Sequence, residues 1–567
     1  MSPTRPEQLL AKLEDARSQI GVIDPRHIER LLQPLFRTRI RRAASLIRFH
    51  DVLLFLSAFP PSQRVLKLSQ VLLTSFESRV KAALKAGEDP EEFAPEEVVG
   101  IAGTVVEGSF SFDLLRRLVV RYPHALSINW EGYERDVQMA SVWPRLFPLM
   151  EEDSLTEANV PYLKWLQAAR GRESELLWLL RSFQNLSQHK KENAGLYDSL
   201  ELLVRWEMSS SPASRTLARR PVRSIYYHRT PLIRRRQISL ADSLAQPQLL
   251  IKKVSRKQGE KILDMVQEAT AVRYRELYGI TLGDPRQVLR AEVGRGVEIY
   301  LWGLSPERRL PLRAYLAGFT LKNGAPINYI EGISLFDWME IGFNTFFAYR
   351  DGETAWVYAQ VLRLLRQLHG VNAISVYPYQ IGDHNEEAIA SGAFWFYRKL
   401  GFRPMRPELA QLTEAEEKKI TKDSGYRTPA QTLRRLSQVH VVYETPDAVA
   451  GAWDSFSMRN IGYEVQRRMA REFNGDAGEM LRATIAIVSK TLAINVASFR
   501  PLERTAFENL ALILALVPDL SRWTKEEKAA VLPIVRAKVA ATEQRYMKLL
   551  KQHQRLRRAI LRLGSKE

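Results

Sequence analysis

The chain of 567 residues contains no cysteine. Disulfide bonds, thiolate zinc sites and a cysteine nucleophile are therefore excluded. Long apolar runs are also missing, because Val52–Phe59 and Leu510–Val517 are far shorter than the ~20 residues that span a bilayer. The first residues lead directly into a charged helical pattern without the apolar core of a signal peptide. We expect a protein without a membrane span, and a cytoplasmic location fits these absences.

Several catalytic signatures are missing as well. The chain has no Gly-x-x-x-x-Gly-Lys phosphate loop, no Gly-x-Ser-x-Gly nucleophile elbow and no His-Glu-x-x-His zinc motif. His384 lies between Asp383 and the acids Glu386 and Glu387, which are side chains that can bind a metal. However, no second histidine is close in sequence, and acids are common caps where a helix begins. We therefore expect no metal site.

Charge of one sign is in excess. The 83 lysines and arginines outnumber the 64 acids, which gives a formal charge of +19. The excess is uneven, since Gly87–Glu97 is acidic while Ser209–Leu240 contains no acid. The arginines of that second segment are Arg215, Arg219, Arg220, Arg223, Arg229, Arg234, Arg235 and Arg236. The part of this segment from Arg215 to Arg236, which holds all of these arginines, has two interpretations. It is either a strip that binds an acidic partner such as nucleic acid, or an arm lying on the acidic surface of a neighbouring domain.

Length and periodicity predict four regions. Residues 1–207 show mostly helical spacing and predict an all-helical domain, with a loop at Ile101–Asp113 and a helix at Leu196–Trp206. Residues 208–245 form the Arg-rich linker or arm. Residues 246–410 mix strand and helix patterns, and residues 411–567 are helical again.

The last segment of the chain predicts one long helix. Its apolar side is spaced 3-4-3-4-3, the pattern of a helix packed lengthwise on a partner helix. The residues of that side are Tyr546, Leu549, His553, Leu556, Ile560 and Leu563. Arginines and lysines occupy much of the rest, and they form either a solvated basic face or a second contact for an acidic partner.

Residues 246–410 predict a strand, a helix, four consecutive strands, and then helix, strand, helix and strand. The six strands before the last helix are Gln248–Arg256, Val297–Leu301, Arg313–Leu321, Ile327–Leu335, Glu340–Tyr349 and Ala373–Tyr377. Asn323-Gly324 predicts a hairpin turn, because both residues tolerate positive φ. This order predicts an α+β fold, with a mixed sheet that carries helices on both faces and helical regions on either side in the sequence.

The last helix of this region has a distinctive ending. It begins near Asn385 and closes in Tyr397-Arg398-Lys399-Leu400-Gly401-Phe402, directly before a new strand. This ending and the order of elements resemble the GNAT superfamily of acyl-CoA-dependent N-acyltransferases. The resemblance covers the chain from about Gln248 to Pro407. The family has three strands in the middle of the sheet where the pattern gives four, and we expect the shortest, Val297–Leu301, not to be a strand.

The resemblance implies that the loop before the helix Val357–Leu368 binds the pyrophosphate of the donor. A helix N-terminus suits this task because of its free N–H donors and its dipole. The family pattern is Gln or Arg, two residues, Gly, one residue, and Gly or Ala. It can be aligned on Arg350, which puts Glu353 at the glycine, or on Gly352 itself. The residues expected to bind the donor are Arg350, Gly352, Thr354 and Ala355.

The resemblance also implies residues for the chemistry. Tyr397 occupies the place of a tyrosine that protonates the leaving thiolate, although a tyrosine there can also be an ordinary core residue. The family often has an asparagine that contacts the pantetheine, and Asn385 is the candidate for it. The acceptor amine needs a base; Glu340 is favoured and Glu331 is the second candidate, and both can also be plain surface glutamates.

Two functions follow from these residues. The first is an N-acyltransferase that moves an acyl group to an amine from a thioester donor. That donor is acetyl-CoA, another acyl-CoA or an acyl carrier protein. The second is a non-catalytic protein that uses a GNAT-like module and basic segments to bind an acidic partner. We favour the enzyme.

Overall fold

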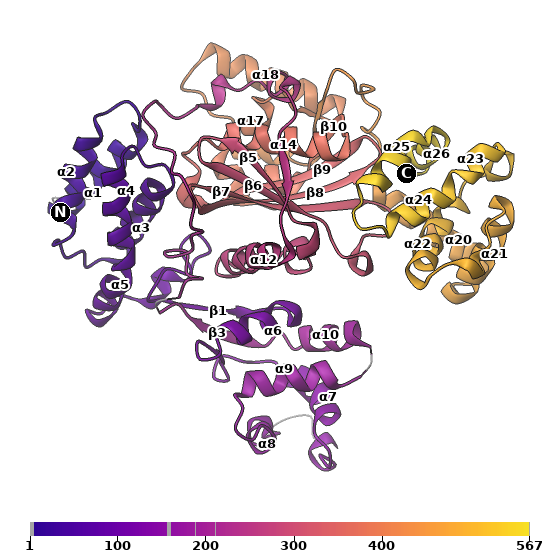
Figure 1. Ribbon diagram of the computed structural model, residues 1–567, viewed down its shortest axis with the longest axis horizontal. Coiled ribbons are helices and arrows are strands. Elements are labelled where there is room, and N and C mark those ends of the chain that lie inside the picture. Colours follow the sequence, from indigo (N-terminus) through magenta and orange to yellow (C-terminus); the bar gives the residue numbers. More distant parts are fainter. Residues whose placement is uncertain (1–4, 156–159, 188, 210, 566–567) are drawn as a thin grey trace.

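The computed structural model describes residues 5–155, 160–187, 189–209 and 211–565. This part of the chain contains one sheet of nine strands and one of three. Figure 1 shows the large sheet at the centre, with helices on both of its faces and helical regions around it. The predicted α+β fold with a central mixed sheet is confirmed. Three hydrophobic cores hold the molecule together, and the largest joins the N-terminal helices to the central sheet.

The first helices pack directly on the central unit. They are α1 (Arg5–Ser18), α2 (Pro25–Leu35), α3 (Ala43–Ala58), α4 (Gln63–Thr74) and α5 (Phe76–Lys85). α3 is apolar around most of its circumference, which is typical of a helix enclosed on all sides. Phe59 follows at its C-terminal end and lies against Gly352 of the central unit. These helices therefore share a core with the sheet.

Residues 99–213 form a second unit with its own core. The sequence predicted this region to be all-helical, but it also contains a small sheet. Its helices are α6 (Phe112–Arg121), α7 (Asp136–Leu146), α8 (Tyr162–Ala169), α9 (Glu175–Asn185) and α10 (Lys190–Asp198). Its sheet has the order β1 (Val105–Ser109), β3 (Leu203–Glu207), β2 (Leu126–Ile128). Both the loop prediction at 101–113 and the helix prediction at 196–206 are therefore wrong at these strands. β1 and β3 pair antiparallel although they are far apart in the sequence, a contact that local periodicity does not reveal.

The nine-stranded sheet contains one more strand than the region 246–410 supplies. Its order is β11-β12-β10-β9-β8-β7-β6-β5-β4. The strands are β4 (Ile251–Lys253), β5 (Leu289–Gly294), β6 (Val297–Trp302), β7 (Ala314–Lys322), β8 (Ala325–Leu335), β9 (Trp338–Thr345), β10 (Ala373–Val376), β11 (Arg403–Pro404) and β12 (Val441–Glu444). Val297–Leu301, which we expected not to be a strand, lies in β6, and β5 was not predicted. β12 lies beyond residue 410, so the sheet continues into the region predicted to be helical.

Helices cover both faces of this sheet, as Figure 1 shows. α14 (Thr354–His369) covers one face, where Tyr358 contacts Phe343 of β9 with ring centroids 4.9 Å apart. α12 (Arg256–Ala271) and the short α13 (Tyr278–Thr281) lie on the other face, where Gly279 adjoins Tyr315 of β7. Burial on both faces explains why β7 and β8 are almost continuously apolar.

The predicted hairpin at Asn323-Gly324 is confirmed, and it also anchors the Arg-rich arm. Asn323 and Gly324 have φ of 48° and 82°, and they join β7 to β8. A Cβ on Gly324 would lie 2.1 Å from the carbonyl oxygen of Arg220 in the arm. The Gly324 carbonyl accepts a hydrogen bond from the Arg220 N–H at 2.9 Å. The arm is therefore ordered against the sheet, mostly without regular structure until α11 (Leu240–Ala245).

The predicted helix from Asn385 to Leu400 is broken. α15 (Pro378–Ile381) comes first, and then α16 (Glu386–Ser391) ends where Gly392 takes a left-handed conformation. α17 (Ala393–Arg398) then continues in a new direction. Gly392 permits the break because glycine adopts positive φ without strain. The break changes which side chains of the segment face the same way.

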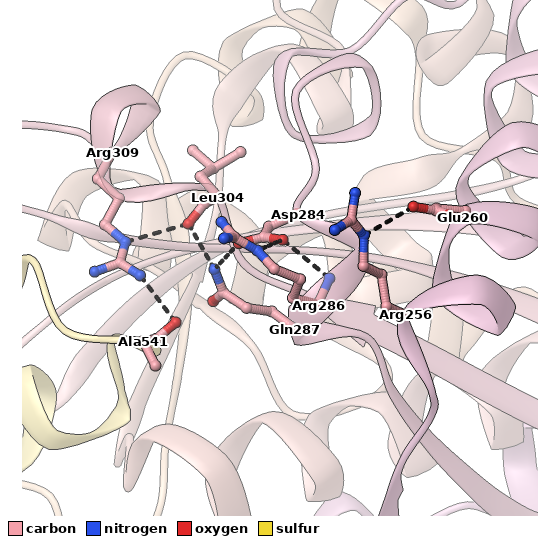
Figure 2. A network of polar contacts seen from close by, with 8 residues as sticks. All are labelled: Arg256, Glu260, Asp284, Arg286, Gln287, Leu304, Arg309 and Ala541. Carbon is pink, nitrogen blue, oxygen red and sulfur yellow. Dashed lines mark hydrogen bonds and ion pairs between the residues drawn. The ribbon is translucent and has the colours of Figure 1, made fainter.

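The C-terminal helices pack against the start of β7 and the β8–β9 turn. After α18 (Pro407–Lys422) and α19 (Ala430–Leu436), the helices are α20 (Met458–Phe473), α21 (Ala477–Leu492), α22 (Pro501–Leu514), α23 (Lys525–Ala529), α24 (Val531–Lys538), α25 (Gln544–Gln552) and α26 (Gln554–Gly564). Figure 2 shows how Arg309 joins the units: its guanidinium donates to the carbonyls of Leu304 and Ala541, both at 3.2 Å. Asp337 and Arg557 add an ion pair at 2.8 Å.

The last segment is two helices, not one. His553 lies between α25 and α26, and its Nδ1 accepts the Leu556 N–H at 3.2 Å as a helix cap. Its other ring nitrogen contacts the Glu527 carbonyl oxygen at 2.9 Å. A side chain used as a cap ends one helix and starts another. Among the described residues, no helix has both the length and the apolar character needed to cross a bilayer.

Candidate functional site

The central sheet divides where β9 and β10 run parallel. In the described residues this is the one parallel pair of the sheet, and it lasts for four residues before the strands separate. β9 continues to Thr345 while the chain after β10 turns into α15. The Phe343 N–H of β9 points into this opening, where it donates to Gln380 Oε1 at 3.4 Å. The separation of two parallel strands thus exposes backbone and side chains to a common space.

A cavity of about 550 Å³ occupies this opening. The strands β8 and β9, the segment before α14 and the helices α15 to α17 all contribute to its wall. Five of the predicted site residues line it together: Glu331, Arg350, Thr354, Asn385 and Tyr397. A volume of this size is in the range of small-molecule sites. The structure thus brings together residues that are up to 66 positions apart in the sequence.

Tyr397 is packed among aromatic rings, and it also forms part of the cavity wall. Its side chain is 5% exposed and adjoins Tyr358, Phe396 and Phe402 at centroid distances of 5.2 to 5.7 Å. No described protein group hydrogen-bonds its hydroxyl. Burial raises the pKa of Tyr397 above its ordinary value. The hydroxyl is therefore protonated at neutral pH, and it can donate to a group in the cavity.

The two candidate bases are in different surroundings. Glu331 lines the cavity, accepts a hydrogen bond from the Tyr315 hydroxyl, and has a pKa raised mainly by burial. Glu340 lies outside the cavity, where its Oε2 is 2.8 Å from His440 Nε2. A carboxylate with a raised pKa inside a cavity is better suited to proton transfer near neutral pH. The position of Glu331 therefore corrects our preference for Glu340.

The loop before α14 turns two of its predicted residues toward the cavity and two away from it. Arg350 and Thr354 line the cavity. Gly352 packs on Phe59, since a Cβ there would lie 2.5 Å from that ring, and Ala355 is buried in the core. The loop therefore presents a cation and a hydroxyl to the cavity.

Glu353, the departure from the family pattern, points in the opposite direction. Its side chain is fully buried against Arg295 Nε at 2.8 Å and Lys322 Nζ at 3.3 Å. The Ile233 N–H of the arm also donates to it, at 3.2 Å. Its charge is thus balanced inside the protein, and it does not face a ligand in the cavity.

Two other contacts restrict what the cavity can bind. Arg350 forms an ion pair with Glu387 at 2.5 Å, so an anion at the loop must compete with a carboxylate. The Asn385 side chain caps α16 by accepting the Ala388 N–H at 3.1 Å, and it donates to the Tyr379 carbonyl at 3.0 Å. The Asn385 amide is therefore engaged within the protein. Both residues therefore have partners within the protein, and a ligand must compete with these contacts.

Sequence reasoning missed other residues of the wall, among them Arg275, Tyr329, Asn344 and Gln380. Alternation along the strands offered a signal for two of them, because Tyr329 and Asn344 are paired in register and share the face of Glu331. Arg275 lies between helices and Gln380 in a short helix, where no motif marks them. Among the described residues, no group of three or more possible metal ligands is found.

Comparisons of the chain with protein-family models, curated proteins and solved structures found no match. The class of protein must therefore be argued from the site.

Proposed function

We propose that this protein is a GNAT-type acyltransferase that moves an acyl group from a thioester donor to an amine. The observation that carries the proposal is the cavity at the split between the parallel strands β9 and β10, lined by Tyr397, Glu331 and Arg350. The sheet order supports it, since α14 connects the two parallel strands and α15 to α17 follow. Five of the eight residues chosen from the sequence, Glu331, Arg350, Thr354, Asn385 and Tyr397, share this one space.

The two proton transfers are assigned to Glu331 and Tyr397. Glu331 accepts a proton from the acceptor amine, whose nitrogen then forms the new amide bond. The thioester supplies the activated acyl carbon, and its carbon–sulfur bond breaks. Tyr397 donates its hydroxyl proton to the leaving thiolate. The raised pKa values of both groups agree with these roles, because Glu331 becomes a stronger base and Tyr397 stays protonated.

The donor is a thioester on phosphopantetheine, and acyl-CoA and acyl carrier protein are its two sources. Arg350 and Thr354 at the start of α14 would face the phosphate nearest the cavity. The Phe343 N–H, which reaches only Gln380 at 3.4 Å, is available to the amide groups of the pantetheine arm. The Arg350–Glu387 pair weakens binding of a pyrophosphate, which leaves the carrier protein open as donor.

The absence of cysteine makes the test direct, because any thiol detected in solution comes from the donor. We would measure thermal stability and thiol release with acetyl-CoA, longer acyl-CoAs, free CoA and an acyl carrier protein, together with a panel of amines. A donor at about 100 times its Kd adds roughly 2.7 kcal/mol to the stability of the folded protein. Tyr397→Phe should keep this shift and slow thiol release by about a hundredfold.

Tyr358→Phe is the matched control. Tyr358 packs on Tyr397, but its hydroxyl is buried, has no described hydrogen-bond partner and does not line the cavity. Its loss should leave both donor binding and thiol release unchanged. If no thioester donor stabilises the wild-type protein, the transferase is refuted, and binding of an acidic partner without catalysis becomes the function to pursue.

A further inference from the structure

Three arginines gather beside the cavity, around a smaller hollow. Arg215 comes from the arm, and Arg273 and Arg275 come from the segment after α12. The hollow holds about 20 Å³, which is room for about one water-sized group. It shares Arg275, Tyr329 and Asn344 with the wall of the large cavity. A ligand in the cavity could therefore extend one small group toward these arginines.

The two inner arginines are buried, and the Arg273 guanidinium lies over the ring of Phe346, 4.2 Å from its centre. Arg215 and Arg273 are 5% and 6% exposed, and neither forms an ion pair with a described residue. Arg215 donates to the backbone carbonyls of Glu96 and Glu97, and Arg273 donates to the carbonyl of Ala269. The Nε–H groups of both arginines are buried without a described partner. Unpaired buried donors are rare and costly.

The acids around the cluster are too few to neutralise it. Glu96 forms an ion pair with Arg275, and Asp51 acts on Arg215 and Arg273 only through space. Burial, followed by the charge of Arg273, lowers the pKa of Arg215 well below its ordinary value. Burial alone lowers the pKa of Arg273, to about 10. The cluster thus holds positive charge that a bound anion would stabilise.

We propose that this cluster binds the anionic group, a carboxylate or a phosphate, of the acceptor amine, with one oxygen of that group in the hollow and the rest in the adjoining cavity. The hollow is on the same face of the sheet as Glu331, because Tyr329 and Glu331 are two residues apart on β8. Side chains at that spacing are on the order of 7 Å apart, so the acceptor would carry its amine and its anion at about that separation or more. The assignment to the acceptor rests on the proposed function, whereas the anion site itself does not.

The test uses inorganic phosphate and sodium acetate as probes at constant ionic strength, with binding measured by calorimetry on the full chain. We expect the wild-type protein to bind one of them, and the preferred probe identifies the group as phosphate or carboxylate. Arg275→Gln and Arg273→Met should each weaken this binding about tenfold or more, since a charge-assisted contact is lost. Arg275 is partly exposed, so its variant keeps the test valid if the Arg273 variant does not fold.

Two control variants locate the anion. Arg403→Gln removes a half-buried, ion-paired arginine on β11, and it should leave the affinity unchanged. Arg350→Gln tests the donor loop as the other place where the probe can bind. Absence of binding in the wild type, or binding lost in Arg350→Gln and kept in Arg275→Gln, would overturn the proposal. Acyl-CoA binding that persists in Arg275→Gln shows that the donor site is separate, so each proposal can fail without the other.

Discussion

Replacing Glu353 by glutamine tests whether this acid serves the fold and not the donor. Glu353 is 1% exposed, and it is the ion-pair partner of Lys322, whose side chain is 0% exposed. The substitution leaves Lys322 buried with neighbouring Arg295 and without an acid. Removing one partner of a buried pair costs about 3 to 5 kcal/mol, and we expect a loss near the lower end, about 3 kcal/mol, because the new amide can still accept a hydrogen bond from the Ile233 N–H.

The loss should depend on pH in a defined direction. Burial lowers the pKa of Lys322 to about 8, and the charge of Glu353 holds it from falling further. Between this value and the ordinary 10.5, the unfolded chain binds more protons than the folded protein, so stability rises with pH. Without Glu353 the pKa of Lys322 falls lower, so its charge is lost at lower pH. The deficit of Glu353→Gln should therefore shrink as the pH rises toward about 8 and stay constant above it, where Lys322 is neutral in both folded proteins.

Hydrogen exchange of the β7–β8 amides measures the loss of stability in Glu353→Gln. The chain has several cores, so a local measurement is needed, and exchange reports the free energy of opening in the strands where Lys322 lies. Asp351→Asn is the control. Its ion pair with Arg17 is largely exposed on the Asp351 side and should cost at most about 1 kcal/mol. Donor binding should be the same in both variants. A loss below about 1 kcal/mol in Glu353→Gln, or improved donor affinity, would refute the orientation of Glu353.

Two further predictions concern stability. His228 and His369 are buried, and burial lowers their pKa values to about 2 and about 4. The unfolded chain therefore binds more protons than the folded protein below pH 6.5. As the pH falls from about 6.5 toward 4, the folded protein loses up to about 3 kcal/mol of stability per histidine. His369→Gln should reduce the slope of stability against pH in this window, and an unchanged slope contradicts the argument. Asp337→Asn breaks the ion pair with Arg557, whose contacts are 2.8 and 3.0 Å long. It should lower the stability of the C-terminal helices by about 3 kcal/mol, measured by hydrogen exchange in α26. Asp447→Asn, which removes an exposed partner of Arg366, is the control and should have little effect.

Much of the central region could be predicted, because the signals there are local. Runs of strand-forming residues identified β7 and β8, and Asn323-Gly324 identified the turn between them. Gly370, with φ of 66°, follows the end of α14 at His369, one residue beyond the predicted helix Val357–Leu368. These features depend on the preferences of a few consecutive residues. The cavity residues Tyr397 and Arg350 were found in the same way, through short motifs.

The errors arose where distant segments decide the structure. β3 pairs with β1, and β12 joins the sheet between β10 and β11, although neither short segment has a strong pattern of its own. The sequence favoured Glu340 over Glu331, but the fold places Glu340 against His440, 100 residues later, and Glu331 in the cavity. Pairing partners and burial are properties of the folded chain.

The sequence by itself determined the α+β class, the main strands and the excess of positive charge, and it singled out Arg350, Thr354 and Tyr397, which line the cavity. The tertiary structure decided which of them meet. It places Glu353 in a buried ion pair and uses the Asn385 side chain as a helix cap. It also brings Arg215 of the arm together with Arg273 and Arg275 of the segment after α12 around one hollow. The physical reason is that backbone preferences act over a few residues, whereas the direction and charge environment of a side chain depend on whatever the fold packs against it.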